Sequence, residues 1–274
     1  MPPTGLFPAP WPTLAEADRR RWLWMGKITL AVAVLWALKR LAHTLQLDLL
    51  RIGVPFIALV LATLVLLTLL LLGVLSDFKE SERLPAELAT LLELQSLQLE
   101  TLRLRQPQLE GAAPQQALLA LAEAILQRLM GRISEPELHR SYHACYRHTA
   151  AAAQALEGSP ALQARLLQPL EGILGILNRI EVIRSTGFVT SVYWLAYLGT
   201  GLTCVGLVFS RLDPPLESGL FLFVVSFLLL FLIHLIQDLD NPFGYCDSSS
   251  AEDVSLEALR LSIARLSRLE GAPS

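Results

Sequence analysis

The hydrophobic and polar positions divide the chain into long apolar runs and one long mixed segment. The run Val54 to Ser76 carries no charged side chain, and at about 1.5 Å per helical residue it reaches roughly 34 Å, more than the hydrocarbon thickness of a bilayer. Ser185 to Ser210 and Ser218 to Gln237 also lack Asp, Glu, Lys and Arg. A charge at mid-bilayer costs several kcal/mol, and a water-soluble helix normally carries charges on one face. These runs therefore predict membrane-spanning helices.

A shorter apolar stretch, Trp22 to Leu38, precedes them. Lys27 interrupts it early, and Lys39 and Arg40 close it. If the helix ends there, Lys39 and Arg40 extend toward the headgroups; if it runs on through His43, they become intramembrane charges and candidates for a functional role. Both readings stay open at this stage.

The segment from Asp77 to Arg184 mixes acidic, basic and apolar residues, and it predicts a helical region facing water. Its periodicity predicts helices at Gln115–Met130, Pro136–Leu156 and Pro160–Arg184. Its first part is apolar on two sides. One face contains Leu84, Leu88, Leu91, Leu92, Leu99 and Leu102, and the other contains Leu94, Leu97 and Leu104. A helix with two apolar faces needs two neighbours, and one of them is expected from another subunit.

These elements predict an all-α polytopic membrane protein with four transmembrane helices in two hairpins and a cytoplasmic helical bundle. We expect 1–21 to be a flexible N-terminal tail, 22–76 and 185–237 to hold the two helix pairs, 77–184 to be cytoplasmic, and 238–274 to be a turn motif with an amphipathic tail. The stripe Ala196, Gly199, Thr203 and Gly206 should let a second helix approach closely. The basic cluster Arg19 to Arg21 favours cytoplasmic termini in the plasma (inner) membrane, although Lys39, Arg40 and Arg51 in the opposite loop weaken that orientation.

Composition supports the membrane assignment and narrows the chemistry. Of 274 residues 53% are hydrophobic, the mean hydropathy is +0.48, and the net charge of -3 gives no sign of a nucleic-acid partner. The three cysteines are far apart and are expected to be free thiols. His139 and His143 lie four residues apart, but no further ligand converges on them, so neither a metal nor a cofactor is predicted. We find no catalytic motif, and an enzyme is the least favoured class.

The most specific short sequence motif follows the last apolar run and is Gln237-Asp238-Leu239-Asp240-Asn241-Pro242-Phe243-Gly244. As local structure it predicts a turn in which Pro242 fixes the backbone, Phe243 anchors in an apolar niche and Gly244 permits a positive φ. Its position resembles the bestrophin family of membrane proteins, in which an acidic pair and a (D/N)-P-F-G turn follow the last membrane helix.

A second resemblance lies at the start of the second span. In bacterial bestrophins a Pro-Phe pair opens the pore-lining helix and the segment Y-x-E-A-R-K-L-W-G follows its cytoplasmic end. This chain has Pro55-Phe56, and Glu80, Arg83 and Leu84 fit the second pattern, whereas Pro85-Ala86 replaces the family's Trp-Gly. The order of spans, helical region, spans and turn is also the family's order.

The resemblance implies a homopentameric ion channel, anion-selective in most members and cation-selective in some bacterial ones, with the second helix lining the pore. When the chain is aligned with the family on Pro55-Phe56, the resemblance implies that Val54, Ala58 and Ala62 face the pore. If the helix is instead rotated about its axis, Leu59, Thr63 and Leu66 face the pore. The predicted function is an oligomeric channel permeable to chloride, with the bilayer, further copies of the chain and inorganic ions as partners. The alternative is a non-conducting membrane-anchored scaffold whose cytoplasmic helices bind another protein, because the second span is also typical of a lipid-facing helix.

Overall fold

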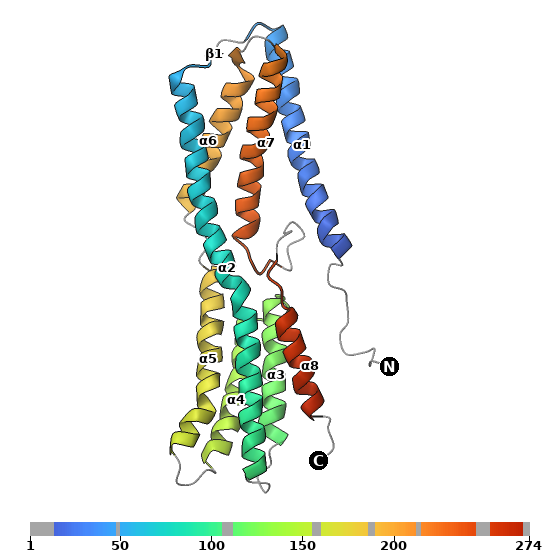
Figure 1. Ribbon diagram of the computed structural model, residues 1–274, viewed down its shortest axis with the longest axis vertical. Helices are drawn as coiled ribbons and strands as arrows, with labels where there is room; N and C mark the ends of the chain where they lie inside the picture. Colours follow the sequence, from blue (N-terminus) through green and yellow to red (C-terminus); the bar gives the residue numbers. More distant parts are fainter. Residues whose placement is uncertain are drawn as a thin grey trace. The chain divides into compact units, whose positions relative to one another are not determined.

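A computed structural model of the chain describes residues 14–47, 50–105, 112–154, 160–185, 190–211, 215–244 and 253–270. In these ranges the elements are α1 Leu14–Thr44, β1 Leu50–Arg51, α2 Val54–Arg105, α3 Ala112–Leu129, α4 Glu135–Gln154, α5 Pro160–Ser185, α6 Thr190–Val208, β2 Ser210–Arg211, α7 Pro215–Leu239 and α8 Glu257–Glu270 (Figure 1). The expected all-α fold is confirmed. Within the segment expected to be an N-terminal tail, α1 already begins at Leu14, and residues 1–13 lie outside the described ranges.

Four of these helices are long and apolar enough to cross a membrane: Trp22–Thr44 in α1, Val54–Leu104 in α2, Thr190–Val208 in α6 and Glu217–Leu239 in α7. The chain is a multi-pass membrane protein. Its first helix continues past Lys39 and Arg40 to Thr44, because nothing between Leu38 and His43 breaks a helix.

The chain forms two compact units. Within the described ranges the membrane unit covers 14–75 and 190–240, and the helical unit covers 76–185, 241–244 and 253–270. The first contains α1, the first part of α2, α6 and α7, whereas the second contains the rest of α2, α3, α4, α5 and α8.

In the membrane unit α1 packs against both α6 and α7, and α6 packs against α7. The two-residue strands β1 and β2 pair in parallel, with Leu50 opposite Ser210 and Arg51 opposite Arg211. The chain enters these strands from α1 and from α6, so the two hairpin connections lie at one end of the unit. This arrangement is the pair of antiparallel hairpins that the short connections predict.

Glycines on α6 allow α2 to approach it closely. A Cβ at Gly206 would overlap the Phe56 ring, and one at Gly199 would lie 2.8 Å from Thr63 Oγ1. Ala196 and Thr203 of the same stripe are buried. The small-residue stripe therefore packs another helix, as expected.

In the helical unit α3 packs against α4 and α8, and α4 packs against α5. The core is built from leucine and isoleucine, with fully buried members Leu88, Leu92, Leu118, Leu121, Ile125, Leu126, Leu129, Leu170 and Ile173. The amphipathic run after the turn forms α8, which buries Leu259, Ile263 and Leu266. One leucine face of α2 joins this core, whereas Leu94, Leu97 and Leu104 on its other face are exposed, at 42%, 57% and 78%.

The turn after α7 forms as expected in all but one detail. Gly244 N donates to Asn241 O at 3.2 Å, and Phe243 is only 3% exposed. Gly244 does not use the positive φ that a glycine permits, since the glycine with positive φ in the described ranges is Gly131. Gly244 is required for space instead, because a Cβ there would lie 2.9 Å from Asn241 Nδ2 and 3.1 Å from Asn241 O.

Candidate functional site

In the membrane unit, α2 has one packed face and one free face. Val54 is 81% exposed, and Ala58 and Ala62 are exposed as well. The same free face carries further apolar side chains: Ile57, Leu61, Leu64, Val65, Leu69 and Leu72. The first pore register thus falls entirely on the side of α2 that no other described helix of the chain covers.

The rotated register falls on or beside the packed side. Thr63 is 3% exposed, and its hydroxyl donates to Leu59 O at 2.9 Å within the helix. Leu59 and Leu66 are half-buried. Thr63 therefore meets α6 at Gly199 and has its hydroxyl proton engaged by its own helix.

The Pro55-Phe56 pair starts α2 and fastens it to α6. Gly53 O accepts hydrogen bonds from Phe56 N and Ile57 N, both at 3.1 Å, while Pro55 occupies the first turn, where its missing N–H costs nothing. The Phe56 ring lies against Gly206. This motif sets the entry of the candidate pore helix.

The side chain of Lys39, a residue of α1, reaches the C-terminal end of α6. Its side chain is buried, and Nζ donates to Leu207 O at 3.1 Å, to Ser210 O at 2.5 Å and to Ser210 Oγ at 3.3 Å. The last carbonyls of a helix lack intrahelical donors and carry partial negative charge, so a cation there is stabilising. Arg40 is exposed and stacks its guanidinium over Trp36, 4.8 Å from the ring centroid.

The three motif residues that follow the second span, Glu80, Arg83 and Leu84, lie in different environments. Glu80 forms a two-bond ion pair with Arg179 of α5, with Oε1 2.8 Å from Nε and Oε2 2.9 Å from the terminal nitrogen. The hydrogen bonds from Arg179 hold the pKa of the Glu80 carboxyl below its ordinary value. Leu84 is buried in the core, whereas Arg83 is exposed.

The two acidic residues after the last span lie at the end of α7 in the membrane unit. Asp240 N still donates to Ile236 O at 3.0 Å, and the Asp240 carboxyl group interacts with the Tyr193 hydroxyl of α6. Asp238 is half-buried one turn before the turn motif. Both residues thus belong to the helix end.

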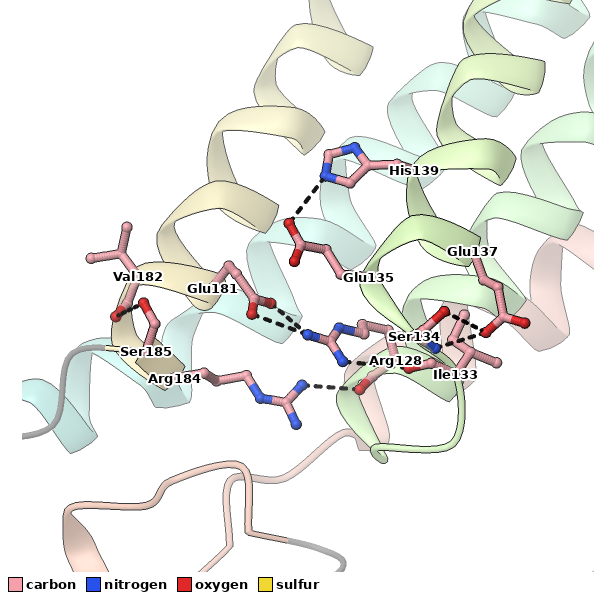
Figure 2. Close-up of polar contacts among 10 residues, drawn as sticks. All are labelled: Arg128, Ile133, Ser134, Glu135, Glu137, His139, Glu181, Val182, Arg184 and Ser185. Atoms are coloured by element: carbon pink, nitrogen blue, oxygen red, sulfur yellow. Dashed lines mark hydrogen bonds and ion pairs between the residues drawn. The ribbon is translucent and has the colours of Figure 1, made fainter.

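A polar network that the sequence does not predict joins the ends of α3 and α5 in the helical unit (Figure 2). Arg128, at the end of α3, binds both oxygens of Glu181 at 2.8 and 3.0 Å, and Arg184 donates to Arg128 O at 3.0 Å. The Arg128 side chain is only 19% exposed. The ion pair therefore ties the end of α3 to the last turns of α5.

The neighbouring corner between α3 and α4 is fixed by local bonds. Gly131 N donates to Arg128 O at 2.9 Å and Arg132 N to Gln127 O at 2.8 Å, which is the Schellman arrangement, and Gly131 has φ 70°. Ser134 N and Oγ bind Glu137 Oε2 at 2.7 and 2.9 Å, and these bonds lower the pKa of Glu137. The Ser134-x-x-Glu137 spacing is a readable signal for this helix start, whereas nothing local pairs Arg128 with Glu181.

The histidine pair and the thiols show no converging ligand set. His139 Nε2 lies 3.6 Å from Glu135 Oε1, and the rings of His139 and His143 are 6.4 Å apart. Across the described ranges no group of three His, Cys, Asp or Glu is arranged to hold a metal ion. Cys145 and Cys204 are free and buried, as expected, and Cys246 lies outside the described ranges. Burial raises the pKa of the Cys145 thiol to about 11, which leaves it unreactive.

Comparison with known proteins identifies the fold. No protein-family model matches the sequence, and no curated protein matches it. Solved structures do match. A variant of a bacterial bestrophin homologue from Klebsiella pneumoniae superposes with a TM-score of 0.74 at 16% identity, over 91% of this chain and 99% of that one. A second structure of a Klebsiella pneumoniae homologue gives 0.72 at 16% identity, over 90% and 98%.

A third structure, a variant described only as a membrane protein, gives a TM-score of 0.73 at 18% identity, over 91% of this chain and 99% of that chain. Agreement over almost the whole length of both chains means that the spans, the helical region and the tail follow one plan. The resemblance drawn from the two sequence motifs is confirmed as a bestrophin-like fold.

Proposed function

On the premise of a bestrophin-like fold, we propose that the chain forms an oligomeric ion channel whose pore is lined by α2. The observation that carries this proposal is the free apolar face of α2, where Val54, Ala58 and Ala62 lie unpacked while the opposite face is fastened to α6. A fold by itself does not imply a function. A pore shared by several subunits, however, requires a helix that packs against its own subunit on one side and is left uncovered by that subunit on the other.

The oligomer is proposed to be a homopentamer. The support is the second free face of α2 in the helical unit, where Leu94, Leu97 and Leu104 are exposed opposite a leucine face that is already in the core. Single exposed leucines are ordinary, but three at helical spacing beside a filled core fit a contact with the next subunit.

We propose the plasma (inner) membrane as the site of action, with both termini cytoplasmic. The four candidate spans return the chain to the side on which it began. The cluster Arg19 to Arg21 before the first span favours the cytoplasmic side by the positive-inside rule. The helical unit, most of which lies between the second and third spans in sequence, would then also be cytoplasmic.

Chloride is proposed as the permeating ion. The small side chains of Ala58 and Ala62 would leave the pore wide at that level. An ion could then pass without the opening of a narrow hydrophobic gate from which water is excluded. No catalytic step forms part of this proposal.

The test is reconstitution of the purified protein in planar bilayers. We expect single-channel currents in symmetric chloride and a shifted reversal potential in a chloride gradient. The variant Ala58→Phe should reduce the unit current, whereas the matched control Ala33→Phe, at an exposed mid-span position of α1, should leave it unchanged.

Two outcomes contradict the proposal in different ways. An unchanged unit current in Ala58→Phe rejects the register on Val54, Ala58 and Ala62. Absence of any current, together with a monomeric mass in detergent, would reject the channel and favour the membrane-anchored scaffold.

A further inference from the structure

Lys27 is the only charged residue in the apolar stretch 22–38, and it lies on an exposed side of α1. Leu23 lies four residues before it on the same side, and Leu30 and Val34 lie three and seven residues after it. These three side chains are 60%, 67% and 52% exposed, so the described part of the chain leaves this side of α1 uncovered. Because α1 is a candidate membrane span, an uncovered apolar stripe on it faces lipid.

Lys27 has no counter-ion among the described residues. No hydrogen bond or ion pair joins its ammonium to any of them. The nearest charged residues of its own helix are also basic, namely Arg21, six residues earlier, and Lys39, twelve residues later. Gly26 beside it is exposed, and a Cβ there would meet no atom within 4 Å, so the space next to this turn is open.

The helices packed against α1 bring no acidic group to the level of Lys27. The sequence of α6 contains no Asp, Glu, Lys or Arg, and α7 has such residues only near its ends, as Glu217 and Asp238. The two helices α1 and α7 run in opposite directions, and the Trp24 ring meets His234. Asp238 lies one turn past His234, whereas Lys27 lies nearly one turn from Trp24 the other way, so roughly 10 Å separates them along the helices. The charge at this level of the membrane unit is therefore positive.

Lys27 also lies near one surface of the membrane. The candidate span starts at Trp22, so Lys27 lies five residues, or about 7.5 Å, inside it. Trp22 and Trp194, near the N-terminal ends of α1 and α6, are both exposed, and tryptophans concentrate where lipid chains meet the headgroups. The stem of a lysine can lie along apolar surface while its ammonium reaches back to that level. The phosphate of a phospholipid is then the acidic group within reach.

We propose that Lys27 binds the phosphate of an anionic phospholipid and so makes the chain prefer such lipids beside the N-terminal end of α1. The uncompensated ammonium attracts a phosphate at this depth. A zwitterionic headgroup carries its own cation next to the phosphate, whereas phosphatidylglycerol does not, so the anionic lipid gains more from the lysine. This inference concerns the lipid-facing side of α1, and it holds whether or not α2 lines a pore.

The experiment titrates the delipidated full chain in detergent with phosphatidylglycerol or phosphatidylcholine and follows the first bound lipid per chain by native mass spectrometry. We expect Lys27→Gln to weaken binding of the first phosphatidylglycerol about fivefold, the equivalent of the ~1 kcal/mol that a basic residue contributes near an anionic membrane surface. Binding of phosphatidylcholine should change much less. Lys27→Arg keeps the charge and should bind phosphatidylglycerol like the wild type.

The matched control is Arg147→Gln, which removes one exposed positive charge from α4, a helix that is not a candidate membrane span. It should leave both lipid affinities unchanged. Equal phosphatidylglycerol affinities for Lys27→Gln and the wild type would overturn the inference. An equal loss for both lipids would overturn it too, because the lysine would then not select by headgroup charge. A lower oligomer mass with unchanged lipid binding would assign this side of α1 to a second copy and would likewise overturn it.

Discussion

Replacing Lys39 by Met tests whether a buried cation holds the end of α6. Methionine has nearly the same length and an apolar tip, so the change removes the ammonium without opening a large cavity. Three contacts disappear, to Leu207 O, Ser210 O and Ser210 Oγ. Leu207 O keeps a partner, because the Ser210 hydroxyl donates to it at 2.8 Å. Ser210 O loses its closest donor.

The size of the effect follows from opposing contributions. A hydrogen bond to a charged group contributes about 1.5–3 kcal/mol, and a cation at a partly buried helix C-terminus contributes up to about 2 kcal/mol. Relief from burying an ammonium offsets part of this loss. We expect Lys39→Met to lower the free energy of unfolding by about 2–3 kcal/mol, which corresponds to a midpoint roughly 5–10 °C lower.

The assay is thermal unfolding of the detergent-solubilised protein followed by tryptophan fluorescence. Lys27→Met is the matched control, because Lys27 lies on the same helix, is exposed and forms no hydrogen bond or ion pair with a described residue. Its effect should stay within about 0.5 kcal/mol. Equal midpoints for the two variants would refute the role assigned to Lys39.

Three further predictions concern packing and pH. Gly206→Ala should destabilise the membrane unit by about 1–3 kcal/mol, because its Cβ would overlap the Phe56 ring. Gly206→Ala should cost less when Phe56 is already replaced by Ala, and equal costs in the two backgrounds would contradict the clash. Phe243→Ala should cost about 3–5 kcal/mol, because the ring is 3% exposed, and a change below 1 kcal/mol in denaturant unfolding would show that the niche collapses. The hydrogen bonds from Arg179 hold the pKa of Glu80 below its ordinary value, so the contribution of this ion pair to stability is present above that ordinary value and is lost as pH falls through the lowered one. Glu80→Gln should therefore flatten the acid limb of an unfolding-versus-pH curve, and an unaltered limb would show that the pair contributes nothing measurable.

Local patterns in the sequence were enough for the elements of this protein. An uncharged run long enough to cross a bilayer has few alternatives, since every backbone polar group in lipid must be bonded within the segment. The helices expected at Gln115–Met130, Pro136–Leu156 and Pro160–Arg184 match α3, α4 and α5 to within a few residues at each end. Length, periodicity and Pro or Gly punctuation are properties of neighbouring residues, so they can be predicted without knowing the fold.

The turn motif and the two possible registers of α2 show where prediction from sequence becomes incomplete. Phe243 was expected to anchor the turn and does so, but Gly244 is needed for space beside Asn241 and not for a positive φ. Both explanations favour glycine, so the residue type alone does not separate them. For α2, two registers were compatible with the sequence, and only packing against Gly199 and Gly206 decided which face is held inside the chain.

The sequence by itself determined that this chain crosses a membrane several times, carries a helical region between its second and third spans, and ends in a turn and an amphipathic helix. Tertiary structure alone decided the partners of the charges that pair over a long sequence distance. Lys39 finds the carbonyl of Ser210, 171 residues further along the chain, and Arg128 finds Glu181, 53 residues further along. Helices form from interactions within a few residues, whereas a charge pairs with whichever group the docking of those helices brings within reach, and no local pattern records that distance.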